Sequence, residues 1–475
     1  MKTKYSNYLK KVEKPLQELV EILSKTFEYV SVLATDCNGT SIRVGQRVKT
    51  VSDYRMNERG FVVRVYQNGL YSEYSFNEFD NNVEQLAKSI VERINEQLEL
   101  IIKTSTKVYT TEMIQEEESK LFVEKEVGII YEDMSIEDLV TKLSKYSEEG
   151  VSMSEYVVDF IAAASVVHVN KLFVSMKKCM AQSYMFSEGN IAALVRKDDK
   201  TNMDYEMYSG LKGPELFDDM GKDIEKVVNN ALELLDASRA EPGEYDIITS
   251  PEVTGLIAHE AFGHGVEMDM FVKNRALGAK YIDKRVASDL VEMHEGALVA
   301  ENTCSFAFDD EGTLAGDVIE IKGGILKTGV ADVLSALRLG IAPTGNGKRQ
   351  SFERKTYTRM TNTVFMGGND KFDDMVASIE HGYLLEGMRS GMEDPKHWGI
   401  QCMLTKGREI KNGKFTGKII APVILTGYVP DLLKSVSMVS KEVYVYGSGM
   451  CGKGYKEWVK AADGGPYLKA KGRLG

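Results

Sequence analysis

The chain has 475 residues, of which 43% are hydrophobic and 27% charged, a mixture typical of globular proteins with two or three domains. Its net charge of -12 disfavours direct binding to nucleic acid, because phosphate contacts need clustered Lys and Arg. The first 25 residues lack the apolar core of a signal peptide, and no apolar run is long enough to span a bilayer. Five scattered cysteines favour a reducing compartment. We therefore expect a soluble, cytoplasmic protein without membrane contact.

The N-terminal half is predicted to mix helices and strands. Apolar residues at helical spacing predict helices over residues 9–23 and 83–98, and Ser135 is expected to cap a third. Asn68-Gly69 between two strand-like runs predicts a β-hairpin. Residues 166–195 are expected to be strands. This part of the chain should therefore be mixed α and β.

The sequence also predicts where this half ends. A helix is expected over residues 222–239, and Pro242-Gly243 should stop the chain from continuing it. We place a domain boundary here, between an N-terminal mixed domain (residues 1–240) and a β-rich C-terminal catalytic domain (residues 241–475). The fold class we expect is α+β.

One predicted helix in the C-terminal half contains the residues most informative about function. It should follow a short strand over residues 245–249, with Ser250 as its capping residue. His259, Glu260 and His264 lie toward its far end.

Zinc peptidases commonly use two histidines four residues apart on one helix face, with a glutamate between them as general base. His259 and His264 are five apart, which separates them by about 140° on a regular α-helix. One inserted residue, as in a π-bulge, would return both imidazoles to one side, and Gly263 makes such a distortion easy. We predict that both histidines hold a zinc ion and that Glu260 activates the attacking water. The alternative is a capping and a packed histidine at a helix end.

The residues alone leave two equal candidates for a third ligand, His294 among acidic neighbours and Cys451 in a Gly-rich stretch. The stretch Gly447 to Lys453 also fits the G-x-x-x-x-G-K spacing of a phosphate-binding loop. Gly454 stands where the Mg²⁺-binding hydroxyl belongs, so a nucleotide site is a minor alternative.

Two stretches resemble the TldD/PmbA family of metallopeptidases. His259-Glu-Ala-Phe-Gly-His264 resembles its His-Glu-x-x-x-His signature, and Gly449-Met-Cys451-Gly-Lys-Gly454 resembles its cysteine loop. The two motifs stand in the family's order. Overall length and the sequence of a mixed and a β-rich half match as well, so the resemblance extends over most of the chain.

The resemblance implies that His259, His264 and Cys451 bind the metal and that Glu260 is the catalytic residue. Zinc is the ion we expect, although Fe²⁺ and Mn²⁺ can occupy similar ligand sets. The family's loop commonly continues Gly-x-Gly-Gln, whereas this chain has Tyr455-Lys456. That departure leaves Cys451 in place and affects the substrate contacts expected near the loop.

The resemblance also implies a peptidase acting on extended or unfolded peptides, in precursor-peptide maturation or protein turnover. An exposed strand edge near the zinc would suit such substrates. A dimer is implied, with an identical or a related subunit. The main alternative is a non-catalytic binding subunit, against which the intact motif argues. A further alternative is a thiol hydrolase with Cys451 as nucleophile, which chelator sensitivity would distinguish.

Overall fold

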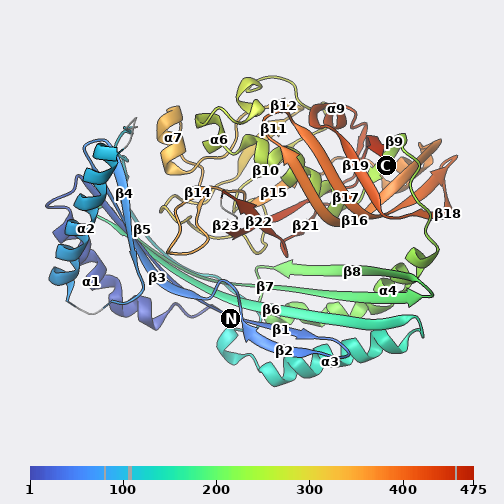
Figure 1. Cartoon of the computed structure of the whole chain (residues 1–475), viewed down its shortest axis with the longest axis horizontal. Coiled ribbons are helices and arrows are strands. Elements are labelled where there is room, and N and C mark those ends of the chain that lie inside the picture. The colour runs from blue at the N-terminus through green and yellow to red at the C-terminus, as the bar shows by residue number, and fades with distance from the viewer. Residues whose placement is uncertain (80–81, 105–109, 455–456) are drawn as a thin grey trace.

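The chain folds as the α+β protein that the sequence predicts, with long strands and helices in its first part and shorter, mostly β elements in its second (Figure 1). The computed structural model describes residues 1–79, 82–104, 110–454 and 457–475. Among the residues so described, no helix combines the length and apolar character needed to cross a bilayer.

The N-terminal half is built on one long-stranded sheet, in the order β4-β3-β1-β6-β7-β5, with β2 beside β1 and β8 beside β7. The hairpin predicted at Asn68-Gly69 is confirmed, because both residues have positive φ and join β3 to β4 in antiparallel register. The strands are β1 Tyr29–Val44, β2 Lys49–Asp53, β3 Glu58–Gln67, β4 Leu70–Phe76, β5 Ser119–Glu124, β6 Val157–Ser175, β7 Lys178–Lys197 and β8 Lys200–Gly210.

Helices cover one face of this sheet. Along β6, the buried apolar residues with even numbers pack against the helices, and those with odd numbers, such as Val169, face the C-terminal half. The helices predicted over residues 9–23, over residues 83–98 and after Ser135 are confirmed, and the Ser135 side chain accepts the N–H of Asp138. These helices are α1 Asn7–Leu23, α2 Val83–Thr104 and α3 Ile136–Ser152.

The helix predicted over residues 222–239 is shorter than expected. The α-helix α4 covers only Ile224–Glu233, and 3-10 turns flank it at 220–223 and 234–236. Ser238 instead donates its backbone N–H to Ile419, so this segment joins a strand ladder of the C-terminal half. That tertiary pairing overrides the local helical pattern.

The C-terminal half contains two larger sheets. One has the order β12-β11-β10-β15-β24-β21. In the other, the pairing β16-β9-β25-β19-β17 closes on itself through β16 and β17, with β18 and β20 attached. Their strands are β9 Gly243–Thr249, β10 Met293–Glu295, β11 Val318–Lys322, β12 Ile325–Leu326, β15 Asn362–Phe365, β16 His381–Asp394, β17 Gly399–Lys411, β18 Lys414–Ile420, β19 Val423–Tyr428, β20 Met438–Val439, β21 Tyr444–Tyr446, β24 Ala462–Gly465 and β25 Leu468–Leu474.

Smaller elements complete this half. The two-stranded ribbon β22–β23, which carries Cys451, stands apart from both sheets. The remaining elements are β13 Gly347–Lys348, β14 Tyr357–Thr358, β22 Met450–Lys453, β23 Glu457–Lys460, α5 Pro251–Leu256, α6 Asp269–Val272, α7 Val333–Leu339, α8 Phe372–Ala377 and α9 Val429–Lys434.

The two halves meet along the uncovered face of the N-terminal sheet (Figure 1). Buried ion pairs join them there, including Arg64–Glu311 at 2.5 Å and Lys406–Asp204 at 2.8 Å. The strands of the first sheet all precede residue 211 and those of the other sheets all follow residue 242 among the described residues. The division into domains at residues 240 and 241 remains our proposal.

Candidate metal centre

The site-bearing helix begins as the sequence predicts. Strand β9 ends at Thr249, the Ser250 side chain accepts the N–H of Val253, and Pro251 occupies the first helical position. After Leu256 the α-helix becomes a π-helix over Ile257–Phe262, followed by a 3-10 turn over Gly263–Val266. The distortion expected from the five-residue histidine spacing is therefore confirmed.

Gly263 lies where this backbone changes type. A Cβ there would stand 2.3 Å from Met360 Sδ and 3.0 Å from the Ala258 carbonyl oxygen, so only glycine fits without rearrangement. The tight contact holds the turn against the strand region around Met360, and it lies directly before His264. The irregular helix end is thus fixed by packing as well as by hydrogen bonding.

Three of the predicted site residues converge. His259 and Cys451 are each 5% exposed, and the candidate ligand atoms of His259, His264 and Cys451 all lie within 4.8 Å of one another. The Cys451 Sγ is 3.3 Å from His264 Nε2, and the two imidazole rings are 5.0 Å apart at 83°. Two nitrogens and a sulfur in one small volume match the donors that zinc prefers.

The charges at these three residues depend on one another. Burial by itself would raise the pKa of the Cys451 thiol, but the imidazoles of His264 and His259 lower that pKa well below its ordinary value. Burial opposes the charged form of His259, yet the neighbouring thiolate raises its pKa to about 9. The same thiolate and Glu267 raise the pKa of His264 against its burial. The group is therefore a thiolate between two imidazoles, the state in which cysteine binds metals.

An unpartnered buried atom supports a metal at this position. His259 Nδ1 is buried and has no hydrogen-bond partner among the described residues. Leaving such an atom unpaired is costly, so its position beside the Cys451 thiolate fits a group in which a cation completes the bonding. The residues present therefore fit a zinc ion held by His259, His264 and Cys451.

Asp463 adds a second buried carboxyl to this neighbourhood. Its Oδ1 has no partner among the described residues, and burial raises its pKa to about 6 while the nearby His259 lowers it. A Cβ at Gly255 would lie 2.5 Å from that oxygen, so the helix can approach β24 only because residue 255 is glycine.

Glu260 lies beside the converging group without joining it. Its side chain is half-buried and packs against β16, where a Cβ at Gly391 would come within 2.4 Å of Glu260 Cγ. The structure therefore places Glu260 as a neighbour of the candidate ligands, held between the helix and a strand.

The rival ligand His294 is not part of the group. It lies on β10, where its Nδ1 is 2.7 Å from Asp317 Oδ1 and its Nε2 is 3.0 Å from Glu292 Oε1. Both ring nitrogens thus have carboxylate partners of their own. The phosphate-loop interpretation of residues 447–453 is also weakened, because the Lys453 amine is bound to Asp269 at 2.7 Å and to Glu267 at 3.0 Å.

Sequence reasoning missed three residues around the ligands. Glu267 is 1% exposed and its Oε2 lies 2.9 Å from His264 Nδ1. Lys453 contacts the same oxygen, and Arg359 donates to the Cys451 carbonyl oxygen at 2.6 Å. Only Glu267 had a local signal, because it follows His264 by three residues. The Tyr455-Lys456 departure from the family loop lies outside the described residues.

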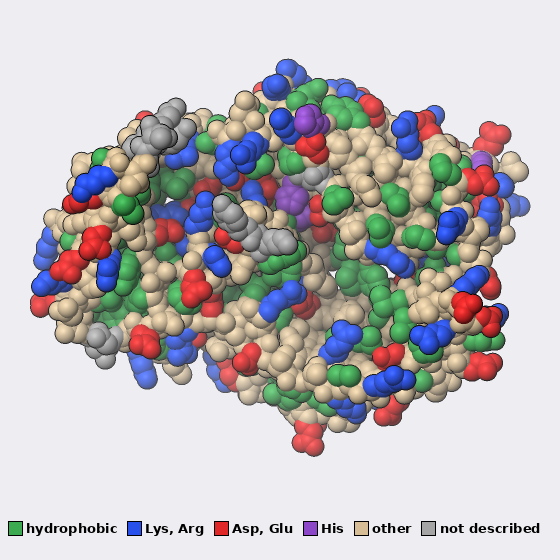
Figure 2. All heavy atoms as spheres, viewed as in Figure 1, with side chains coloured by type: hydrophobic (Ala, Val, Ile, Leu, Met, Phe, Trp, Pro, Cys, Tyr) green, Lys and Arg blue, Asp and Glu red, His purple; other side chains and the backbone are tan. Residues whose placement is uncertain are grey.

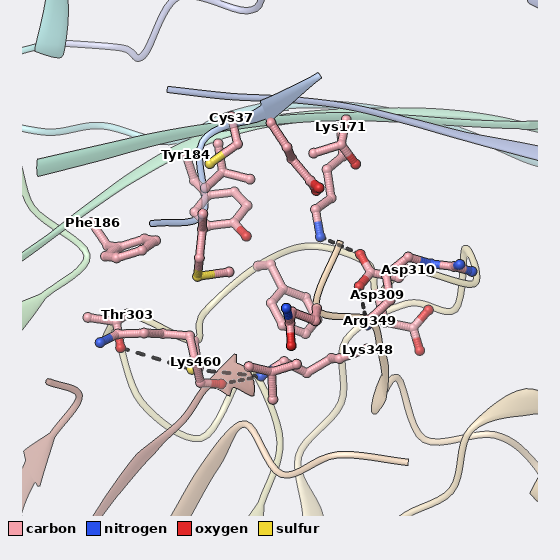
Figure 3. Close-up of a pocket in the computed structure, with 18 of the residues that line it drawn as sticks. Cys37, Lys171, Tyr184, Phe186, Thr303, Asp309, Asp310, Lys348, Arg349 and Lys460 are labelled. Carbon is pink, nitrogen blue, oxygen red and sulfur yellow. Dashed lines mark hydrogen bonds and ion pairs between the residues drawn. The ribbon is translucent and has the colours of Figure 1, made fainter. Parts of the chain in front are cut away.

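Two connected spaces adjoin the cysteine ribbon. An open hollow of about 830 Å³ is lined by Met450 and Trp458 of the ribbon, and it shares Met56, Glu58 and Gln350 with an enclosed cavity of about 70 Å³. The cavity lies between the halves of the chain (Figure 3).

Both polar and apolar side chains line the enclosed cavity. At one end Lys171 points to Asp310, and at the other the Lys348 amine donates to the Lys460 carbonyl oxygen at 2.5 Å (Figure 3). The face of the molecule seen in Figure 2 has Lys, Arg, Asp and Glu interspersed over it, without a continuous block of positive charge. That distribution agrees with the expectation drawn from the net charge.

Comparison with known proteins identifies the family. Residues 242–471 match the PmbA/TldA metallopeptidase C-terminal domain. A Metalloprotease TldD homolog of Buchnera aphidicola is 32% identical over 246 residues, which cover 50% of each chain. A Zinc metalloprotease TldD homolog of Saccharolobus solfataricus is 27% identical over 287 residues, 60% of this chain and 61% of that one. The chain spans about half the length of the first curated relatives that it matches.

The fold similarity extends further along the chain. The crystal structure of TldE from Thermococcus kodakarensis superposes with a TM-score of 0.76 over 97% of this chain and 99% of its own, at 16% identity. At that identity the similarity concerns the fold alone. Through its C-terminal half, and with a fold shared over nearly its whole length, the chain belongs to the PmbA/TldD family.

Proposed function

We propose that the chain is a zinc-dependent peptidase that hydrolyses extended or unfolded peptides. The observation that carries the proposal is the convergence of His259, His264 and Cys451 within 4.8 Å, which depends on a π-helix that the five-residue spacing requires. The names of relatives as metalloproteases, one of them a zinc metalloprotease, support it further.

In this proposal His259, His264 and Cys451 hold the zinc ion and Glu260 is the general base. When bound, zinc acts as a Lewis acid that lowers the pKa of a water molecule toward ~7 and polarises the peptide carbonyl. The Glu260 carboxylate accepts the proton of the attacking water and then donates it to the departing amine. Packing between Leu256 and Gly391 holds Glu260 in place for both transfers.

The surroundings of the ribbon suit a peptide in extended form. The hollow along Met450 and Trp458 is large enough for several residues, and Trp458 is 46% exposed, which offers an apolar surface beside the proposed thiolate ligand. We propose that substrate chains lie in this hollow, as precursor peptides or as proteins being degraded. We further propose a dimer, with an identical or a related subunit.

The test is Glu260→Gln, assayed for hydrolysis of an unstructured peptide and for zinc content. Gln is nearly isosteric but cannot accept a proton, so turnover should fall by ~10² to 10⁴ while zinc content and melting temperature stay unchanged. Wild-type turnover in Glu260→Gln would refute the catalytic role and favour a non-catalytic binding subunit.

A thiol hydrolase is the second candidate, because the Cys451 thiolate is 3.3 Å from a histidine nitrogen. A chelator separates the two functions. A zinc peptidase loses activity with chelator and regains it when zinc is added, whereas a thiol hydrolase keeps its activity and is inactivated by alkylation of Cys451.

A further inference from the structure

The proposed ligands come from two segments that are far apart along the chain. His259 and His264 lie on the distorted helix end, and Cys451 lies on the ribbon β22–β23, 187 residues after His264. A metal centre needs its ligands held within a few tenths of an ångström, because donor distances to zinc vary little. Contacts between the helix end and the ribbon must therefore supply this alignment.

Glu267 and Lys453 make one such contact. Glu267 Oε2 lies 2.9 Å from His264 Nδ1 and 3.0 Å from Lys453 Nζ, so one oxygen joins a candidate ligand to the ribbon. The Glu267 side chain is 2% exposed and the Lys453 side chain 11% exposed. With Nδ1 donating to a carboxylate, His264 presents Nε2 toward Cys451, the tautomer that a metal ligand needs.

Arg359 makes the second contact and lies wholly in the interior. Its Nη2 donates to the Cys451 carbonyl oxygen at 2.6 Å and its Nη1 to the Glu457 carbonyl oxygen at 3.2 Å, so it binds both strands of the ribbon. Its Nε is 3.9 Å from Glu267 Oε1. The guanidinium therefore faces the carboxylate that orients His264.

The charges around Lys453 balance. Its amine lies between the carboxylates of Glu267 and Asp269 and also donates to the Thr358 carbonyl oxygen at 3.0 Å. Removing the amine would leave two buried carboxylates with less compensation, which is costly in the interior. The carboxylates would then move or take up protons, and His264 would lose its fixed partner.

We propose that Glu267, Lys453 and Arg359 form a ligand clamp, a set of positioning residues that holds His264 and Cys451 in register for the metal. The inference rests on the proposed function, because it assumes that these ligands bind zinc. It assigns the Gly-Lys pair of the ribbon to ligand alignment and not to phosphate binding. None of the three residues touches substrate, so their effect passes through the ligands.

The test measures zinc affinity of the full chain by competition with a chromophoric chelator. Glu267→Gln and Lys453→Met should each weaken zinc binding by roughly 10- to 100-fold, as partners of metal ligands do. Lys453→Arg keeps the charge and should recover part of the loss. Lys406→Met is the matched control, because it breaks another buried pair between the halves, Lys406–Asp204 at 2.8 Å, and should leave zinc affinity unchanged.

Further readouts separate alignment from general stability. The double variant Glu267→Gln/Lys453→Met should lose less than the product of the two single effects, because both act through one contact. Melting of the zinc-free proteins shows whether a variant is folded. Should Lys453→Met fail to fold, the nearly isosteric Glu267→Gln decides the question. Zinc affinities within about threefold of wild type in folded variants, or fully multiplicative losses, would overturn the clamp. A wild-type chain that binds no zinc would instead overturn the proposed function.

Discussion

Substituting Gly391 should displace the proposed general base without touching the ligands. Gly391 lies on β16, and a Cβ there would stand 2.4 Å from Glu260 Cγ and 3.0 Å from both Glu260 Cβ and Leu256 Cδ1. Ordinary van der Waals contact begins at 3.4 Å, so in Gly391→Ala the Glu260 side chain or the strand must shift by about 1 Å. The clashing atoms lie near the Glu260 backbone, so rotation of the carboxylate alone does not relieve the contact.

The size of the effect follows from that shift. A misplacement of ~1 Å at a catalytic group costs ~10²-fold in rate, and overpacking costs ~1–3 kcal/mol of unfolding free energy. We therefore expect Gly391→Ala to lower turnover of an unstructured peptide about 100-fold with zinc content unchanged. Gly399→Ala on the neighbouring β17 is the control, because a Cβ there meets nothing within 4 Å. Equal turnover in the two variants would refute the view that Gly391 positions Glu260.

Two further predictions concern the ligands and the pH dependence of stability. His264→Ala and Cys451→Ser should each reduce bound zinc from about one equivalent to well below it, and full occupancy in both would remove the ligand assignment. Burial raises the pKa of Glu252 to about 7, although the Tyr205 hydroxyl donates to it. The folded chain then keeps a proton that the unfolded chain loses above pH ~4.5, so this group lowers stability as pH rises to 7. Glu252→Gln should therefore gain unfolding free energy relative to wild type between pH 5 and 8, by at most ~3 kcal/mol, in urea titrations. A constant difference across that range would contradict the shift.

Local patterns predicted much of the fold. The six apolar residues that mark the first helix are all buried in α1, and the Asn68-Gly69 hairpin follows from the positive φ that its turn needs. The spacing of His259 and His264 predicted a distorted helix, because geometry allows few ways to bring them together. These features depend on residues close together in sequence.

What the sequence could not predict depends on distant contacts. Nothing near Arg359 indicates that its guanidinium binds the backbone of the ribbon almost a hundred residues later, and Lys453 suggested a phosphate loop. The shortened α4 follows from pairing between Ser238 and Ile419. The sequence alone also left Cys451 and His294 level as third ligands, because ligand choice depends on where β10 and β22 lie.

The strand order has a consequence for the time at which the centre is completed during synthesis. Strand β9, which leads into the site-bearing helix, pairs with β25, so Thr249 lies opposite Leu468. Cys451, β24 and β25 all belong to the last 25 residues of the sequence. A nascent chain that displays both histidines therefore lacks the thiolate, and the closed sheet cannot form until its final strand arrives. The order of translation thus keeps the growing chain from assembling the centre before the rest of the molecule is available to enclose it.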